Sequence, residues 1–224
     1  MPAPHLTIRR FALGQWMTNC YVLHAPGTGG AAPARGRECW IIDAGFEPGP
    51  MIEYIQEQKL MPRQVILTHA HLDHIAGLNL IRGTWPQVGI LVHREEQEFL
   101  TEPELNLSAD FDEPVITPPA TGLLSHGQRL ELEGLVFEVR HIPGHSPGGV
   151  CLYQAQAAAV FVGDVLFNGG IGRYDFPTSD AERLVDSIRT QLYTLPDATR
   201  VYPGHGPATT VGQEKGHNPY VRAE

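Results

Sequence analysis

One segment constrains the fold more than any other, because an apolar strand runs directly into a group of metal-binding side chains. Residues 65–77 read VILTHAHLDHIAG. His69 and His71 are two residues apart, so an extended backbone directs both imidazoles to the same face. Asp73 and His74 follow where the strand gives way to a turn, and they can approach the same point from another side. Imidazole and carboxylate are the ligands that zinc, iron and manganese accept in proteins.

The number of ligands in this segment indicates two metal ions rather than one. A catalytic zinc usually takes three protein ligands in all. Four ligands within six residues exceed that need, so we expect two metals to share the loop. A solvated, histidine-rich turn is the alternative, and the rest of the chain disfavours it.

Three further strand ends carry the same residue types. Residues 142–149 read IPGHSPGG, residues 161–164 read FVGD, and residues 202–206 read YPGHG. Proline and glycine form a stiff turn, and here that turn can present a histidine at the end of a strand. The pattern predicts His145, Asp164 and His205 as additional ligands. Asp43 also follows a strand, and two roles stay open for it: a hydrogen-bonding support for the metal loop, or an ordinary turn aspartate.

The apolar periodicity predicts strands and helices in two successive groups. Strands are expected over 6–13, 19–24, 39–42, 65–67, 90–93, 129–132, 135–141, 149–154, 160–162 and 199–202. Helices are expected over 50–60, 77–85, 94–100 and 181–192, with a helix or turn over 211–217. Residues 25–37 are too rich in Gly and Pro to pack and predict a surface hairpin loop. Residues 101–120 predict a long loop near the site, a candidate lid.

This order predicts an α/β fold of two similar halves. Each half is a sheet covered by helices on its outer face, and the sheets pack together as an αββα sandwich of two mixed β-sheets. We expect residues 1–224 to form a single domain, with a site where the two sheets meet.

Composition excludes several classes of function. The net charge of -9 disfavours a nucleic-acid partner, because phosphate binding requires a basic surface. Three cysteines without CxxC spacing favour reduced thiols and a cytoplasmic location. We expect no membrane partner, since no apolar stretch is long enough to span a bilayer and no signal sequence precedes the first strand.

Taken together, the pattern HxHxDH, PGH, GD and PGH resembles the metallo-β-lactamase superfamily over nearly the whole chain. The resemblance implies the αββα fold and two divalent metal ions, zinc first, with iron or manganese as alternatives. It implies a hydrolytic enzyme whose nucleophile is a metal-bridging hydroxide, oriented by Asp73. It also implies the ligand sets: His69, His71 and His145 for one metal, Asp73, His74 and His205 for the other, and Asp164 as the bridge.

Two segments, residues 163–177 and 202–220, resemble the short bacterial glyoxalase II group, the hydroxyacylglutathione hydrolases. The resemblance implies hydrolysis of a small thioester, S-D-lactoylglutathione or a related glutathione thioester. It places Arg173 where the group contacts the glycine carboxylate of glutathione, and a guanidinium can pair bidentately with a carboxylate. A structural arginine after a glycine turn is the other reading.

The sequence departs from the longer glyoxalase II enzymes at several points. No C-terminal helical substrate domain is expected. The longer enzymes have aromatic and basic residues after their glycine turn and a tyrosine shortly after the last PGH, whereas Asp175 and Gly206-Pro207 stand near those positions here. These departures bear on glutathione recognition rather than on hydrolysis. Two rivals stay open: a persulfide dioxygenase with one iron on His69, His145 and Asp164, and a lactone hydrolase.

Overall fold

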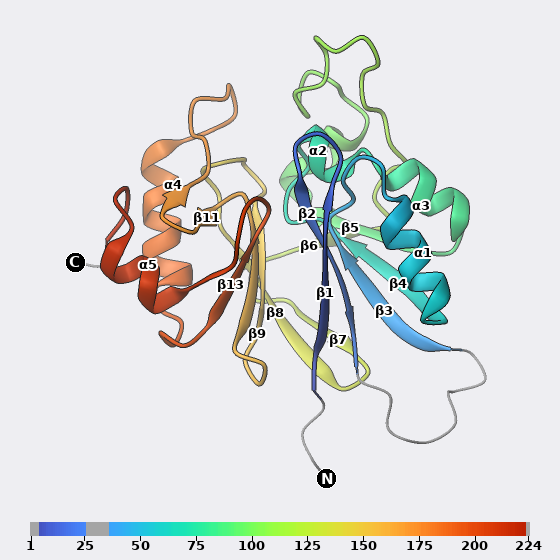
Figure 1. Ribbon diagram of the computed structural model, residues 1–224. Helices are drawn as coiled ribbons and strands as arrows, with labels where there is room; N and C mark the ends of the chain where they lie inside the picture. The colour runs from blue at the N-terminus through green and yellow to red at the C-terminus, as the bar shows by residue number, and fades with distance from the viewer. Residues whose placement is uncertain (1–4, 26–35, 223–224) are drawn as a thin grey trace.

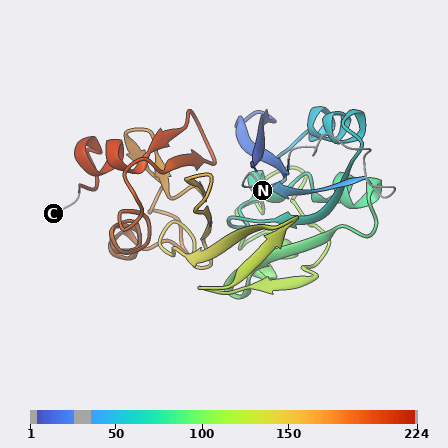
Figure 2. The ribbon, with the colours of Figure 1, turned by 90° about the horizontal axis from the view of Figure 1, so that it is seen from below.

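Two six-stranded sheets lie face to face in the computed structural model, which describes residues 5–25 and 36–222. Helices cover the outer face of each sheet, at the left and right of Figure 1, and the view from below in Figure 2 separates the same layers. The predicted αββα sandwich is therefore confirmed.

The first sheet has the strand order β1-β2-β3-β4-β5-β6. Its strands β1 to β3 are antiparallel neighbours, and β3 to β6 are parallel. Their bounds are β1 (Thr7–Leu13), β2 (Thr18–His24), β3 (Arg37–Ile42), β4 (Leu60–Ile66), β5 (Gly89–His93) and β6 (Gly122–Leu124).

The second sheet has the order β14-β13-β10-β9-β8-β7. It is antiparallel except for the parallel pair β10 and β13. Its strands are β7 (Arg129–Leu132), β8 (Leu135–His141), β9 (Val150–Gln154), β10 (Ala159–Gly163), β13 (Arg200–Pro203) and β14 (Thr209–Thr210), and a separate hairpin pairs β11 (Leu166–Phe167) with β12 (Gly170–Ile171).

The helices divide between the two sheets. The first sheet is accompanied by α1 (Gly49–Glu57), α2 (Leu72–Ile75), α3 (Leu78–Thr84) and the short 3₁₀ turns η1 (Arg94–Glu96) and η2 (Glu98–Leu100). The second is covered by α4 (Ala181–Ser187), its π-helical continuation η3 (Ile188–Leu192) and α5 (Val211–His217). Among the described residues, none of these helices has the length and apolar character needed to cross a bilayer.

Strand alternation builds the core in separate layers. In β2, Cys20 and Val22 pack toward the helices of the first sheet, whereas Tyr21 and Leu23 pack between the sheets. This is the period of two that buried strands impose. A third cluster seats Leu184 and other apolar residues of α4 and η3 on the second sheet. The two sheets are thus fixed against each other, and their loop ends can share one site.

Several predicted boundaries were wrong. The helix expected to reach residue 60 ends at Glu57, because Lys59 adopts a φ of 53° and Leu60 already begins β4. Asp73 and His74 lie on the one-turn helix α2 rather than on an irregular turn. Strands β6, β11, β12 and β14 were not predicted, because two or three residues are too few to display a period of two.

The structure tests only one of the two long loops that the sequence predicted. The loop expected over residues 25–37 lies mostly outside the described residues. Residues 101–120 form the expected long loop without helix or strand. The loop is attached to the site, because Leu72 donates its backbone N–H to the carbonyl of Asn106 at 2.9 Å, and Asn106 Nδ2 donates to the carbonyl oxygens of Phe99 and Val115. Movement of this loop as a lid stays a prediction.

Candidate metal centre

The candidate centre lies where strands from both sheets end at the same edge. The loops after β4, β8, β10 and β13 converge there, near the label of α2 at the top of Figure 1. They carry all seven side chains that the sequence predicted as ligands: His69, His71, Asp73, His74, His145, Asp164 and His205.

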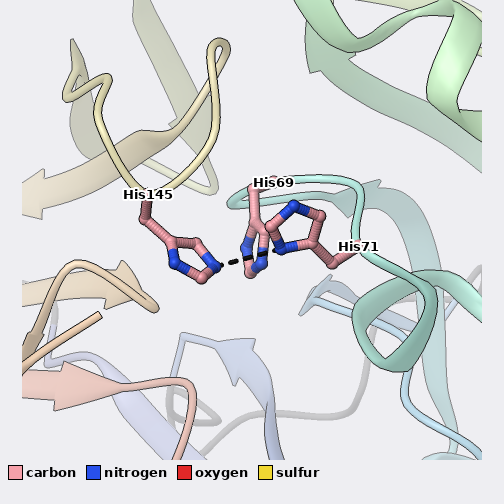
Figure 3. A group of neighbouring side chains, drawn as sticks. All are labelled: His69, His71 and His145. Atoms are coloured by element: carbon pink, nitrogen blue, oxygen red, sulfur yellow. Dashed lines mark hydrogen bonds between the residues drawn. The ribbon is translucent and has the colours of Figure 1, made fainter. Parts of the chain in front are cut away.

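A three-histidine set forms the first half of the centre. His69, His71 and His145 each offer a ring nitrogen within 4.8 Å of the others. Figure 3 shows the three rings directed toward one another, with His71 Nδ1 at 3.0 Å from His145 Nε2. All three side chains are buried. The first two come from the loop after β4 and the third from the loop after β8, so both sheets build this set.

A second set lies beside the first. Asp73, His74 and His205 also place one ligand atom each within 4.8 Å of the others. His205 Nε2 is 3.2 Å from Asp73 Oδ2, and His74 Nε2 is 3.5 Å from the same oxygen. The Thr18 hydroxyl donates to this oxygen at 2.7 Å, which fixes the carboxylate.

Asp164 lies between the two sets. Its Oδ1 is 3.3 Å from His74 Nε2, and its Oδ2 is 3.3 Å from His205 Nε2 and 3.9 Å from His145 Nε2. A Cβ on Gly204 would lie 2.1 Å from Asp164 Oδ1, so only glycine lets the second PGH turn approach so closely. One carboxylate therefore faces histidines of both sets.

Hydrogen bonds on the far side of the rings orient the imidazoles. A ring Nδ1 bonded to a carboxylate or carbonyl oxygen carries a proton, which makes Nε2 the nitrogen that can bind a cation. This arrangement occurs at His74 with Asp43 Oδ2 (2.9 Å), at His145 with the Arg173 carbonyl (2.8 Å) and at His205 with the Trp16 carbonyl (3.1 Å).

Several inward atoms of the centre have no hydrogen-bond partner within residues 5–25 and 36–222. They are Nε2 of His69 and His74, and Oδ1 of Asp164, all buried, while at His71 the nitrogen that faces His145 is Nδ1. A buried polar atom without a partner is costly and rare in folded proteins. These lone pairs converge from imidazole and carboxylate groups, so the residues present fit two divalent metal ions of the zinc, iron or manganese type.

The histidines of the two sets differ in their protonation. Burial lowers the pKa of His71 to about 3, and burial also lowers the pKa values of His69 and His145, so this set is neutral and ready to bind a metal. Burial lowers the pKa of His74 as well, but the surrounding carboxylates raise it more, to well above its usual value. For His205 the balance is the same, with a pKa of about 10. In the second set, protons take the place that a cation would occupy.

Asp43 supports the centre from behind. It adopts a φ of 58°, a left-handed conformation that aspartate tolerates better than most residues. Its Oδ1 accepts the Thr68 backbone N–H at 2.7 Å, and its Oδ2 accepts the Thr68 hydroxyl at 2.7 Å and His74 Nδ1 at 2.9 Å. Of the two roles left open for Asp43, the structure confirms the first: it supports the metal loop by hydrogen bonds.

Asp43→Asn should weaken both the fold and metal binding. An amide nitrogen replaces one acceptor oxygen and faces a donor, which leaves a buried donor unpaired. We expect a loss of about 1–3 kcal/mol in the free energy of unfolding and of roughly 10–100-fold in metal affinity. Urea unfolding and chelator competition measure the two effects, with Asp112→Asn on the exposed loop as the control. Unchanged metal affinity would contradict the supporting role.

A cavity of about 500 Å³ opens onto the centre. Its walls combine the metal-centre residues with apolar and aromatic side chains from separate loops: Trp16, Leu72, Leu107, Phe111, Phe167, Ile171 and Phe176. Such a mixture, apolar walls with a few convergent polar groups, is typical of small-molecule sites.

Arg173 also lines this cavity, and its guanidinium is already paired. Its guanidinium donates to both carboxylate oxygens of Asp175, at 2.9 and 3.0 Å, and lies 4.2 Å from the ring centre of Phe176. Both members of the pair are largely exposed, at 66% and 64%. The side chain can therefore exchange Asp175 for another carboxylate at little cost.

Sequence reasoning missed several residues of the site. Thr18, Trp16 and Phe176 act on the centre or the cavity without belonging to any repeated motif. Glu96 was also missed, because a single glutamate in a short acidic segment has the pattern of a solvated turn. The only local signal is at Thr18 and Trp16, which stand at or near strand ends.

A family model described as the Metallo-beta-lactamase superfamily matches residues 13–205. A probable metallo-hydrolase of Bacillus subtilis, YqgX, is 37% identical over 95% of this chain and 96% of its own length. The hydroxyacylglutathione hydrolase GloC of Haemophilus influenzae is 39% identical over 82% of this chain and 87% of its own length.

Several solved structures have a similar fold. The BLEG-1 B3 metallo-beta-lactamase has a TM-score of 0.87 at 36% identity, with 97% of this chain and 100% of that chain covered. TTHA1623 in a di-iron-bound form has a TM-score of 0.80 at 34% identity, with 95% and 100% covered. ETHE1 from Myxococcus xanthus has a TM-score of 0.74 at 28% identity, with 95% and 83% covered.

Proposed function

The chain belongs to the metallo-beta-lactamase superfamily; from this premise, we propose that it is a metal-dependent hydrolase that cleaves a glutathione thioester, S-D-lactoylglutathione or a close relative, with two metal ions. The proposed ligands are His69, His71 and His145 for one metal, Asp73, His74 and His205 for the other, and Asp164 between them. We also propose that residues 1–224 act as one domain, because both sheets supply ligands.

The observation that carries the two-metal proposal is the presence of two converging sets with Asp164 facing both. With only one metal bound at the first set, the carboxylate of Asp73 and the rings of His74 and His205 would face each other with no cation between them. Two divalent metals would lower the pKa of a bound water to about 7 and polarise a thioester carbonyl.

The protein contributes orientation and exclusion of water. Asp73, held by Thr18, is the side chain we propose to orient the nucleophile. Asp43 and the carbonyls of Trp16 and Arg173 fix the rings of the ligand histidines. Trp16 and Phe111 lie edge to face with ring centres 5.7 Å apart, on two loops that border the cavity. They shield the reacting carbonyl from bulk water.

Similarity to GloC supports glutathione as the carrier, and Arg173 supplies the only guanidinium that the described residues place on the wall of this cavity. We further propose zinc as the metal, since it suits this donor set. The three cysteines are free and buried, which favours a cytoplasmic location.

A persulfide dioxygenase is the second candidate. The likeness to TTHA1623 in a di-iron-bound form, at 34% identity, supports iron as the metal. On that model one iron would use His69, His145 and Asp164. The second set, Asp73 with His74 and His205, favours the hydrolase.

An anaerobic assay separates the two candidates. S-D-lactoylglutathione is offered to the purified protein without oxygen, and the metal content of the same sample is measured. Rapid thioester loss with close to two metals per chain would support the hydrolase. No hydrolysis with one iron per chain would move the assignment to the dioxygenase, with oxygen uptake on glutathione persulfide as the next assay. No hydrolysis with two metals bound would discard glutathione and direct attention to lactones and other thioesters.

Arg173→Ala should raise KM for S-D-lactoylglutathione by about tenfold, while kcat changes less, because a charge-assisted contact to a remote carboxylate serves uniform binding. The backbone carbonyl that holds His145 is kept in this variant. Asp175→Ala should have the opposite effect and lower KM, since it releases the guanidinium. Steady-state kinetics check both, with a thioester that lacks the carboxylate as the control. A change confined to kcat would assign Arg173 to chemistry or structure.

A further inference from the structure

Glu96 is a fully buried carboxylate outside the proposed ligand sets. It ends the 3₁₀ turn η1 after β5, and its side chain is 0% exposed. A buried carboxylate needs partners, because its desolvation is expensive. The partners here are neutral donors rather than a cation.

The two oxygens of Glu96 bind two different loops. Oε2 accepts the Ala70 N–H at 2.5 Å, and Oε1 accepts the Gly148 N–H at 2.8 Å. Ala70 stands between His69 and His71, and Gly148 lies in the loop that carries His145. One carboxylate therefore ties together the two segments that present the three-histidine set.

The loop around Gly148 is shaped for this contact. A Cβ at this position would lie 2.9 Å from Glu96 Cγ and 3.1 Å from His93 Nδ1, so any side chain would push the loop away. Burial raises the pKa of Glu96 to about 7, against the effect of Ser146 and the two backbone N–H groups. The protein therefore keeps a costly group at this point, and the group's contacts are with the two histidine-bearing loops.

We propose that Glu96 is a positioning residue that sets the distance between His145 and the His69–His71 pair, and thereby the metal affinity of the three-histidine set. This inference rests on the metal-binding part of the proposed function, and it is independent of the substrate. Charge-assisted hydrogen bonds from backbone N–H groups to a carboxylate are short and strong, which suits them to hold two loops in register.

Glu96→Gln is the first test, because it keeps the shape of the side chain and changes one acceptor into a donor. The amide nitrogen would face the N–H of either Ala70 or Gly148, so one loop would be released. Zinc affinities of both sites are measured by competition with a chromophoric chelator. We expect the three-histidine site to lose roughly 10–100-fold in affinity, as removal of a support behind a ligand does. The Asp73, His74 and His205 site should stay within a few-fold.

Glu98→Gln is the matched control, since Glu98 lies two residues away, is exposed and undergoes the same chemical change. Cobalt-substituted protein provides a second readout: the ligand-field spectrum of the first site should change in Glu96→Gln and not in Glu98→Gln. A general loss of stability would weaken both sites together and would not select one of them.

The outcomes are distinguishable. Two tight metals in both wild type and Glu96→Gln would overturn the inference and leave the proposed function intact. Failure of the wild type to bind two metals would overturn the proposed two-metal function instead. Should Glu96→Gln not fold, amide resonances of the ¹⁵N-labelled wild type decide: the Ala70 and Gly148 protons should lie strongly downfield and shift together on one titration. Ordinary shifts, unaffected by pH, would reject the two hydrogen bonds.

Discussion

Asp164→Ala should remove metal and hydrolysis together. Asp164 faces histidines of both sets, at 3.3 Å from His74 and His205 and 3.9 Å from His145. Its loss leaves the inward Nε2 atoms without the anion that balances two cations. Loss of an outer support costs about 10–100-fold, so loss of the shared carboxylate should lower kcat by more than about 100-fold. Elemental analysis and the thioester assay on the same sample measure both effects.

Two variants control for unrelated causes. Asp112→Ala removes an exposed aspartate from the 101–120 loop and should leave metal content and rate unchanged. Asp164→Asn keeps the shape but not the charge, and should retain at most part of the metal. A fully loaded Asp164→Ala protein with two metals per chain would show that the bridging assignment is wrong.

The ligand residues of the centre were predictable because they occur in short sequence motifs. In HxHxDH the spacing itself brings His69 and His71 to one face, and the repeated PGH marks His145 and His205 at strand ends. Every one of these residues lies in the centre. In the second sheet β8, β10 and β13 run in the same direction, because β9 is antiparallel to both β8 and β10 and β10 is parallel to β13, so the ends that carry these motifs lie at one edge of the sheet.

The supports of the centre were not predictable in the same way. Asp43 bonds Thr68 at a separation of 25 residues, and Glu96 bonds Ala70 at a separation of 26. No spacing rule connects such pairs, because the contact exists only after β3, β4 and β5 have paired side by side. Asp43 could be suspected from its place at a strand end. Glu96 could not, since an isolated glutamate carries no sign of burial.

The effective charge of each histidine also depends on the folded site. His71 and His205 are both predicted ligands, yet burial lowers the pKa of His71 to about 3, and the carboxylates of Asp164 and Asp73 outweigh burial to raise that of His205 to about 10. The difference arises because His205 is less buried and hydrogen-bonds directly to both carboxylates, whereas burial and the neighbouring His145 outweigh the same carboxylates at His71. It has a direct consequence for metal loading.

Metal loading at the second set should depend steeply on pH, and loading at the three-histidine set should not. At pH 7 the raised pKa values of His74 and His205 keep both rings protonated in the metal-free protein. A metal binds only the neutral imidazole, so binding must release these protons. Each displaced proton weakens binding by about tenfold for every unit that pH falls. Between pH 8 and pH 6 the second site should therefore lose about 100-fold in affinity per pH unit.

Calorimetry in two buffers of different ionisation enthalpy counts the protons. We expect about two protons on filling the second set, and close to none from the rings of the first, because His69, His71 and His145 have lowered pKa values and are already neutral. His205→Ala should reduce the second count by one. Near pH 6 the protein should hold one metal firmly and exchange the other. A proton count of zero at both sites would mean that carboxylate charge does not control loading, and equal counts would mean that the two sets are not electrostatically distinct.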